Sequence, residues 1–590
     1  MTIERDEVSP DRDPQLGRRL LAWIRPYRWG VLGAVALLLV EAGLALVGPA
    51  LTQRVIDVAI PARDGDLLLR YALAFLGALT AGFAAEYGYT VLTAWVGQRV
   101  MSDVRRRVFG HLQRLSLPYF DRQPVGRLVT RVTSDVESLN ELFSSGVVTV
   151  LGDVATLVAI SAMMLAVDWR LALLVFTTLP LMVLVVALFR TRMREAFRTI
   201  RGAVARLNGF LQEHLSGVRV VQLFDREAAV RRDFAAANEA HLAAQLRSIT
   251  LYALFFPIVE VLTATAVALL LWVGGVRTLD GAVTVGTLAA FIQLARRFFQ
   301  PLQDLSEKFN LLQSAMASGE RIFRLLDTPI EVPEPVAPRP LPTPARGEVR
   351  FEDVWFRYAP EAPWALRGVT FTVPAGATVA LVGPTGAGKS TILSLLLRHY
   401  LPTRGRILLD GVDIAEVASH DVRSRIGFVP QDLFLFRGNL ERNLRLDRML
   451  PDEALAHALA TAGADALVAR LPGGLSHEVA ERGRSLSVGE RQLLSFARAL
   501  AGDPPILLLD EATSAIDPES EGRIQDALSR SRDGRTAIVV AHRLGTITEA
   551  DRILVFHHGE LTEAGTHREL LGAGGRYDRL VRLQRGAQAA

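Results

Sequence analysis

Six long apolar stretches dominate the first half of the chain, between about residues 29 and 305. Each approaches or exceeds the roughly 20 residues that a helix needs to cross the hydrocarbon core of a bilayer. A helix also satisfies its own backbone hydrogen bonds, which an apolar environment requires. The pattern therefore predicts six transmembrane helices, centred on VLGAVALLLVEAGLALVGPALTQ, LLLRYALAFLGALTAGFAAEYGYTVLTAWV, VVTVLGDVATLVAISAMMLAV, LALLVFTTLPLMVLVVALF, LYALFFPIVEVLTATAVALLLWVGG and GAVTVGTLAAFIQLARRFFQPL.

The connections between these stretches alternate in length. The first, third and fifth are short, near residues 61–66, 167–170 and 276–281, whereas the second and fourth are long, rich in arginine and helical in pattern. Because arginine is enriched on the cytoplasmic side of membranes, we expect both long connections and both termini to lie in the cytoplasm. The sequence predicts a multi-pass protein of a bacterial-type inner membrane, without the pattern of a cleaved signal peptide.

The pattern changes after about residue 327. The stretch DTPIEVPEPVAPRPLPTPARG is too rich in proline to continue a helix and predicts an extended linker. Beyond it, short apolar strand-like runs alternate with helical ones, which is typical of an α/β nucleotide-binding domain. The predicted fold is a multidomain membrane protein, in which an all-α six-helix transmembrane domain precedes an α/β P-loop domain. We expect an N-terminal tail at 1–16, the transmembrane domain at 17–327, the linker at 328–347 and the nucleotide-binding domain at 348–585.

Composition excludes some alternatives. Hydrophobic residues make up 50% of the 590 residues, which favours a membrane protein. The chain has no cysteine, so disulfide scaffolds and thiolate metal sites are excluded. The net charge of +4 could suggest a nucleic-acid partner, but arginines in cytoplasmic loops explain it better. We therefore expect lipid as the surroundings of the chain and no nucleic-acid partner.

A glycine-rich motif follows a predicted strand in the second half of the chain. Residues 383–390 read GPTGAGKS, the phosphate-loop pattern GxxxxGK[ST] between a strand and a helix. Backbone N–H groups of such a loop surround phosphate oxygens at the helix N-terminus. Lys389, one of only two lysines in the chain, would contact the β- and γ-phosphates of ATP, and the Ser390 hydroxyl would ligate Mg²⁺. The predicted loop residues are Gly383, Pro384, Thr385, Gly386, Ala387, Gly388, Lys389, Ser390 and Thr391.

A second motif, PPILLLDEATSAID, begins as an apolar strand and ends in acidic residues. Asp510 at the end of the strand is placed to hold Mg²⁺ through water, and Glu511 is placed to polarise the attacking water. The less favoured alternative for Glu511 is a solvated carboxylate at a strand end. Its position behind a phosphate loop favours the catalytic interpretation.

The phosphate loop, SLSVGERQLLSFARAL and LLLDEATSAID follow six predicted membrane helices in that order. Over roughly residues 17–583 the chain resembles the ATP-binding cassette (ABC) exporters of the half-transporter kind, which fuse one membrane domain to one nucleotide-binding domain. The resemblance implies a second half-transporter as partner, because Ser487 and Gly489 of the SVGE segment would serve the ATP held by the partner's phosphate loop. It also implies short coupling helices near YFDRQPVGRL and SGVRVVQLFDRE.

The same resemblance assigns roles to further single residues. Tyr358 in FRYAP would stack on adenine, and Gln431 would contact Mg²⁺ and sense the γ-phosphate. Asp517 would belong to the loop that faces the partner, and His542 would contact the γ-phosphate. The expected catalytic residues are then Glu511, His542 and Lys389, and the expected Mg²⁺ ligands are Ser390, Gln431 and Asp510.

The signature segment departs from the common LSGGQ at two places, since Val488 replaces glycine and Glu490 replaces glutamine. SVGE is also a helix capping box, S-x-x-E, and a capped helix N-terminus suits a phosphate. A carboxylate near a triphosphate is electrostatically less favourable than an amide. Two assemblies therefore stay open: a homodimer, which we slightly favour, and a heterodimer with one weakened ATP site.

Ionisable residues interrupt the apolar stretches at Glu41, Glu86, Asp153, Glu260, Arg296 and Arg297. Such residues usually face a bundle interior or an aqueous cavity, or pair with one another. Both signs occur, so the sequence indicates no substrate charge. We expect ATP-driven export of a lipophilic or amphipathic substrate, such as a drug, lipid or peptide. The alternatives are an ATP-gated channel or a regulatory membrane ATPase without net pumping.

Overall fold

The computed structural model describes residues 15–143, 147–510, 518–532, 534–541 and 544–588. The contacts of the chain divide it into two compact units. The first comprises Met1–Gln113 with Val125–Thr328, and the second comprises Arg114–Pro124 with Pro329–Ala590.

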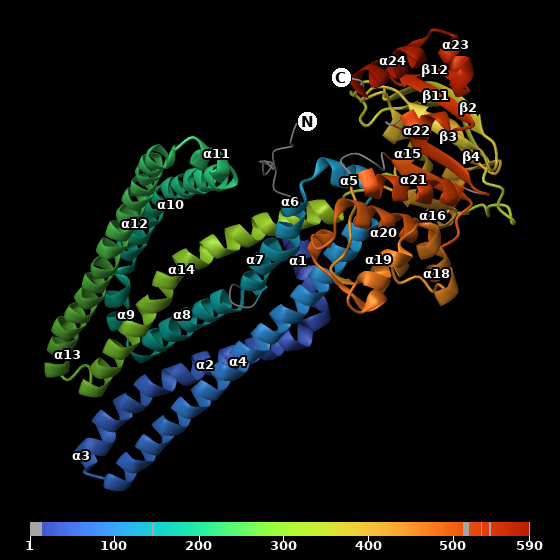
Figure 1. The fold of residues 1–590 in the computed structure, drawn as a ribbon. Helices are drawn as coiled ribbons and strands as arrows, with labels where there is room; N and C mark the ends of the chain where they lie inside the picture. Colours follow the sequence, from blue (N-terminus) through green and yellow to red (C-terminus); the bar gives the residue numbers. More distant parts are fainter. Residues whose placement is uncertain (1–14, 144–146, 511–517, 533, 542–543, 589–590) are drawn as a thin grey trace. The chain divides into compact units, whose positions relative to one another are not determined.

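The first unit consists of helices, several of them very long (Figure 1). Short π-helical or 3-10 turns join some of them. The α-helices are α1 (Leu16–Ile24), α2 (Arg28–Arg54), α3 (Ile60–Ala62), α4 (Gly65–Arg114), α6 (Val125–Thr130), α7 (Val136–Glu141), α8 (Val147–Val167), α9 (Trp169–Phe176), α10 (Leu179–Ser216), α11 (Val218–Leu223), α12 (Glu227–Leu269), α13 (Gly275–Leu279) and α14 (Val285–Leu326).

Pairs of long helices lie side by side in this unit, α2 with α4 and α10 with α12 (Figure 1). Just before α2, the Tyr27 hydroxyl donates a 2.7 Å hydrogen bond to Asp103 of α4. Between α10 and α12, the rings of Phe189 and Phe255 stack with their centroids 4.0 Å apart. An apolar core joins α8, α9, α10, α12 and α14, and its largest members include Ile160, Met164, Leu171, Phe291 and Phe299.

One predicted apolar stretch is divided in the structure. The segment LALLVFTTLPLMVLVVALF forms α9 and α10, which meet at Thr177 and Thr178. Pro180 lies in the first turn of α10, where its missing N–H costs no helical hydrogen bond. The proline therefore begins a new helix instead of extending α9, and this break lies within a single candidate membrane span, Trp169–Ser216.

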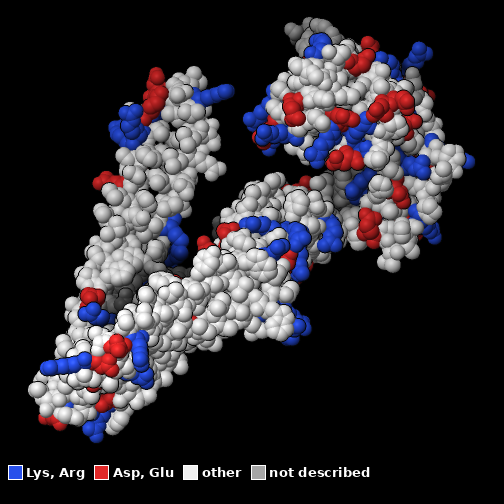
Figure 2. Space-filling view, turned by 90° about the horizontal axis from the view of Figure 1, so that it is seen from below, with Lys and Arg blue, Asp and Glu red and all other residues white. Residues whose placement is uncertain are grey.

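Five helical segments of the described part are long and apolar enough to cross a membrane. They are Leu16–Ala62, Gly65–Arg114, Val150–Val167, Trp169–Ser216 and Glu227–Leu279. The sixth predicted stretch lies in α14, which carries Arg296 and Arg297 and is not among these five. Figure 2 shows long parts of the helical surface with few charged side chains, as lipid-facing surface requires.

The second unit contains two larger sheets. A four-stranded antiparallel sheet has the order β2-β1-β4-β5, and a six-stranded sheet has the order β12-β11-β3-β10-β9-β6. All neighbours in the six-stranded sheet are parallel except β11 and β12. The strands are β1 (Val349–Phe356), β2 (Leu366–Val373), β3 (Thr378–Val382), β4 (Arg404–Leu409), β5 (Val412–Asp413), β6 (Ile426–Val429), β7 (Gly438–Asn439), β8 (Glu478–Val479), β9 (Ile506–Asp510), β10 (Thr536–Val540), β11 (Arg552–His557) and β12 (Glu560–Gly565).

Helices cover the parallel strands, which explains their sequences. Strands β3 and β10 are buried at every position, as expected of strands covered on both faces. Edge strand β12 instead alternates between more and less exposed residues. The helices of this unit are α5 (Leu117–Arg122), α15 (Lys389–Leu396), α16 (Ser419–Ser424), α17 (Leu440–Arg445), α18 (Asp452–Thr461), α19 (Asp465–Arg470), α20 (Val488–Leu500), α21 (Pro518–Arg532), α22 (Leu544–Thr548), α23 (His567–Gly572) and α24 (Arg576–Gln588).

The proline-rich segment after α14 forms neither helix nor strand and is tied to the second unit. The completely buried Arg398 donates to the Glu334 carboxylate at 3.0 Å, to the Pro333 carbonyl at 2.9 Å and to the Ser419 hydroxyl at 2.6 Å. The guanidinium thereby fixes the path of the segment. The stiff spacer expected from its prolines is held by specific contacts.

Candidate functional site

The strand order of the six-stranded sheet brings the predicted nucleotide-binding motifs to one edge. Strands β3, β10, β9 and β6 are adjacent and parallel, so their carboxyl ends lie together. The phosphate loop follows β3, Asp510 ends β9, and Gln431 follows β6 by two residues. Ligands of open α/β sheets bind at this kind of edge.

The phosphate loop has the backbone that its glycines permit. Gly383 and Gly388 have φ angles of +153° and +100°, which side-chain-bearing residues rarely adopt. A Cβ atom on Gly383 would lie 2.2 Å from the Phe556 carbonyl oxygen, and one on Gly388 would lie 2.8 Å from the Ala365 carbonyl oxygen. Both positions therefore require glycine. The loop ends at Lys389, the first residue of α15, so the N-terminus of that helix faces the loop.

Lys389 and Ser390 supply a cation that can bind phosphate and a hydroxyl that can bind Mg²⁺. The Lys389 ammonium is buried and donates to the carbonyl oxygens of Gly383 at 2.7 Å and Pro384 at 3.1 Å, which keeps its charge at the loop. The next residue, Ser390, donates to the Asp510 carboxylate at 3.4 Å. A hydroxyl beside a carboxylate is the hard oxygen donor set that Mg²⁺ prefers. The residues present fit this ion.

Tyr358 lies next to the helix that carries the phosphate loop. Its hydroxyl shares a 2.9 Å hydrogen bond with Thr391, and its ring packs edge-on against Phe356 and Tyr400. Burial raises the pKa of the Tyr358 hydroxyl, so it stays protonated at neutral pH. About half of the side chain is nevertheless exposed, which leaves ring surface available to a base.

The signature segment forms the capping box that its sequence predicts. The Ser487 hydroxyl accepts from the backbone N–H of Glu490 at 3.2 Å, and the Glu490 carboxylate accepts from the backbone N–H of Ser487 at 2.8 Å. Arg470 lies 3.8 Å from the same carboxylate. The Glu490 carboxylate is therefore engaged in its own helix cap, and the nearby Arg470 guanidinium partly balances its negative charge. Gly489 is buried in the first turn of α20. This weakens the electrostatic objection to a glutamate in this segment.

Three predicted site residues lie outside the described part of the structure: Glu511, Asp517 and His542. In the sequence, Glu511 directly follows Asp510, the last residue of β9, and His542 directly follows Ala541. Their roles stay predictions. Gln431 is described and exposed just past β6.

Comparisons with known proteins agree with this geometry. A family model for the ABC transporter transmembrane region matches residues 31–302, and the model for the ABC transporter itself matches residues 366–514. An uncharacterised ABC transporter ATP-binding protein of Bacillus subtilis, YknV, is 38% identical over 96% of this chain and 94% of its own length. The chain belongs to the ABC exporters of the half-transporter kind.

Two further proteins extend the comparison of this ABC exporter. A fatty acid ABC transporter ATP-binding/permease protein of Mycobacterium bovis is 40% identical over 82% of this chain and 76% of its own length. The solved structure of a bacterial Atm1-family ABC exporter with ATP bound matches with a TM-score of 0.77 at 30% identity, over 94% of this chain and 98% of that one. The ABC exporter is thus a multi-pass membrane protein that binds and hydrolyses ATP to drive transport and works as a dimer.

Sequence reasoning missed two residues that connect this site to the rest of the second unit. The Tyr400 hydroxyl donates to the carboxylate of Asp121, a residue of α5. Tyr400 also touches Tyr358 edge-on, with ring centroids 5.2 Å apart. The short helix α5 ends within the YFDRQPVGRL segment, whose coupling role stays a prediction, and no local pattern indicated the contact with Tyr400.

Proposed function

We propose that this ABC exporter moves a lipophilic or amphipathic substrate across a bacterial-type inner membrane, with both termini in the cytoplasm. The observation that carries the proposal is the phosphate-loop geometry of Lys389, Ser390 and Asp510 on a chain whose described part also has five candidate membrane spans. The domain bounds expected from the sequence belong to the same proposal.

ATP binding would use the sheet edge as follows. The phosphate-loop N–H groups and the ammonium of Lys389 surround the phosphates, and Tyr358 stacks on adenine. Ser390, Asp510 and Gln431 would hold Mg²⁺, which neutralises charge on the β- and γ-phosphates when bound. Ser390 and Asp510 are joined by a 3.4 Å hydrogen bond, and Gln431 follows β6, the neighbour of the strand that ends in Asp510.

Hydrolysis would depend on the residues that follow β9 and β10. Glu511 would polarise the attacking water and His542 would contact the γ-phosphate, while Asp517 would face the partner cassette. Ser487 and Gly489 at the capped N-terminus of α20 would complete the partner's site. Because Glu490 is held in that cap, we retain the preference for a homodimer over a heterodimer with one weakened site.

The substrate class rests on a large cavity in the helical unit and on a relative whose name specifies a fatty acid. The alternative is an ATP-gated channel or regulatory ATPase. Purified protein in inside-out liposomes separates the two: an exporter accumulates a fluorescent drug, a labelled phospholipid or a fatty acid against its gradient only while ATP is hydrolysed. Lys389→Ala is the control that should abolish uptake.

A channel would give the opposite result. Flux would stop at equilibrium, and it would persist in Glu511→Gln with ATP bound but not hydrolysed. The orientation of the termini can be tested separately, because the chain has no cysteine and a single introduced cysteine can be labelled from either side. Labelling of residues in the second unit from outside intact cells would contradict the proposed orientation.

A further inference from the structure

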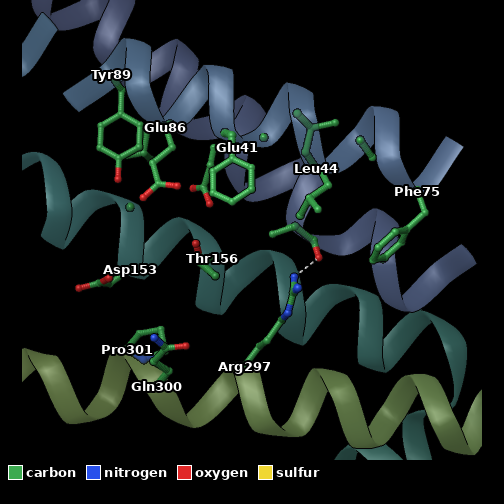
Figure 3. Close-up of a pocket in the computed structure, with 18 residues that line it drawn as sticks. Glu41, Leu44, Phe75, Glu86, Tyr89, Asp153, Thr156, Arg297, Gln300 and Pro301 are labelled. Carbon is green, nitrogen blue, oxygen red and sulfur yellow. Dashed lines mark hydrogen bonds between the residues drawn. The ribbon is translucent and has the colours of Figure 1, made fainter. Parts of the chain in front are cut away.

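We propose that a cavity in the helical unit selects amphipathic organic cations, and this inference rests on the proposed export function. The cavity has a volume of about 680 Å³. Its walls come from four helices, α2, α4, α8 and α14 (Figure 3). Cavities of roughly 300–1,000 Å³ are the usual size for drug-sized molecules.

The charged groups in the cavity are mostly acidic. Glu41 comes from α2, Glu86 from α4 and Asp153 from α8, whereas Arg297 of α14 is the one basic residue among the described residues that line it. Figure 3 shows the carboxylates of Glu41 and Glu86 close together and turned into the same space. Among the described lining residues, three are acidic and one is basic.

The one guanidinium is already engaged. Arg297 donates to the backbone carbonyl of Ala45 on α2, as the dashed line in Figure 3 marks. A substrate anion would have to compete with this carbonyl and would also face Glu41 and Glu86. A substrate cation faces two neighbouring carboxylates whose mutual repulsion it relieves. The charge of the lining therefore favours a cation.

The remaining wall is apolar and aromatic, which suits a lipophilic body. Phe75, Phe83 and Tyr89 of α4 contribute rings, and aromatic faces attract organic cations. Small residues widen the space next to them, including Ala45, Gly48, Ala78, Gly82 and Gly152. It is this combination of volume, apolar wall and net negative lining that specifies the ligand class; the acidic residues alone would not.

The structure separates the ionisable residues of the apolar stretches into those that line the cavity and those that do not. Glu41, Glu86, Asp153 and Arg297 meet at the cavity, whereas Glu260 of α12 and Arg296 are exposed and are not part of its lining. Glu260 is therefore a matched control: it has the same side chain, lies in another candidate span, and is outside the site.

The test uses two probes of nearly equal size and shape and opposite charge, tetraphenylphosphonium and tetraphenylborate. Their binding to the detergent-purified full chain is measured directly, which avoids their partition into lipid. We expect tetraphenylphosphonium to bind more tightly than tetraphenylborate. The double variant Glu41→Gln with Glu86→Gln should weaken tetraphenylphosphonium binding at least tenfold, and Glu260→Gln should leave it unchanged. The thermal unfolding of each variant in detergent, followed by its helical circular-dichroism signal, checks that the helical unit is folded.

The inference would be overturned by tighter binding of tetraphenylborate, or by tetraphenylphosphonium binding that the double variant leaves unchanged. A folding failure of the double variant does not end the test, because the single variants Glu41→Gln and Glu86→Gln should each reduce the preference for the cation. If tetraphenylphosphonium fails to bind while ATP-driven uptake of another substrate persists, the cation site is refuted and the exporter function stands. If it binds in the expected way but no substrate is ever accumulated, the site stands and the export function is refuted.

Discussion

The hydrogen bond between Tyr400 and Asp121 gives a quantitative prediction about how α5 is held. Asp121 belongs to α5, in the connection between α4 and α6, and Tyr400 follows the phosphate-loop helix by four residues. Tyr400→Phe removes the donor hydroxyl but keeps the ring, which packs edge-on against Phe356 and Tyr358 at 5.3 Å and 5.2 Å. The substitution therefore tests the hydrogen bond almost alone.

The expected magnitude follows from the groups involved. A hydrogen bond to a charged acceptor contributes about 1.5–3 kcal/mol when both groups are desolvated. The Tyr400 side chain is only 8% exposed, but Asp121 is an exposed residue and can be rehydrated, so we expect a loss of about 1–2 kcal/mol. Burial and the bond to Asp121 both raise the pKa of Tyr400, so its hydroxyl remains a donor at neutral pH.

Hydrogen exchange measures this loss locally. If α5 opens without global unfolding, a loss of about 1–2 kcal/mol should speed exchange of its amides about 5–30-fold, because 1.4 kcal/mol corresponds to a factor of ten. Asp121→Ala, which removes the acceptor, should produce a similar change, and the double variant should add little to either single one. Unchanged exchange of α5 in both single variants would refute the reasoning.

A matched control exists in the same unit. Tyr577 is completely buried and shares a 2.6 Å hydrogen bond with His567, so Tyr577→Phe removes the same hydroxyl from another place. Its effect should appear in α23 and α24 and leave α5 unchanged. If Tyr577→Phe also accelerated amide exchange in α5, the loss of any buried hydroxyl would destabilise the whole unit. The specific role of Tyr400 would then be refuted.

Four further predictions concern single residues of the second unit. Lys389→Ala should lose MgATP affinity, because its ammonium neutralises phosphate charge. Glu511→Gln should bind MgATP almost normally and hydrolyse it about 10²–10⁴-fold more slowly in single-turnover kinetics. Near-normal hydrolysis by Glu511→Gln would remove Glu511 from the mechanism. Tyr358→Ala should weaken ATP binding by about 1–3 kcal/mol and Tyr358→Trp should largely retain it, as titration with a fluorescent ATP analogue would show. Glu490→Gln should keep both the helix cap and the ATPase rate, whereas Glu490→Ala should lower the stability of α20 by about 0.5–2 kcal/mol, as urea unfolding would show. If the purified chain has a weak ATPase activity that rises only when a second half-transporter is added, the heterodimer is supported instead. Burial lowers the pKa of His399 from 6.5 to about 4 in the folded chain, so on acidification the unfolded chain takes up a proton at a higher pH than the folded chain does. The free energy of unfolding should therefore fall by about 2 kcal/mol between pH 7.5 and pH 5. His399→Gln should remove this pH dependence.

Several features of this ABC exporter could be predicted from sequence because they are local. The phosphate loop is one contiguous strand-turn-helix, and its glycines specify the backbone that the structure has. The capping box of Ser487 and Glu490 involves residues three apart, so spacing alone determines which groups can meet. Apolar stretches of sufficient length indicated the membrane helices in the same way. In each case the interacting groups are close along the chain.

Only the tertiary structure decided which distant residues meet. Asp121 and Tyr400 are 279 positions apart, and no spacing rule connects a residue of one predicted loop with one that follows a phosphate-loop helix. The division of the ionisable residues into four that line a cavity and two that do not depends on how α2, α4, α8 and α14 are rotated against one another. A hydropathy pattern determines that a helix is apolar, but the direction of a single polar side chain is set by the packing of neighbouring helices. For that reason the sequence left the charge of the substrate open, and the packed helices supplied a preference.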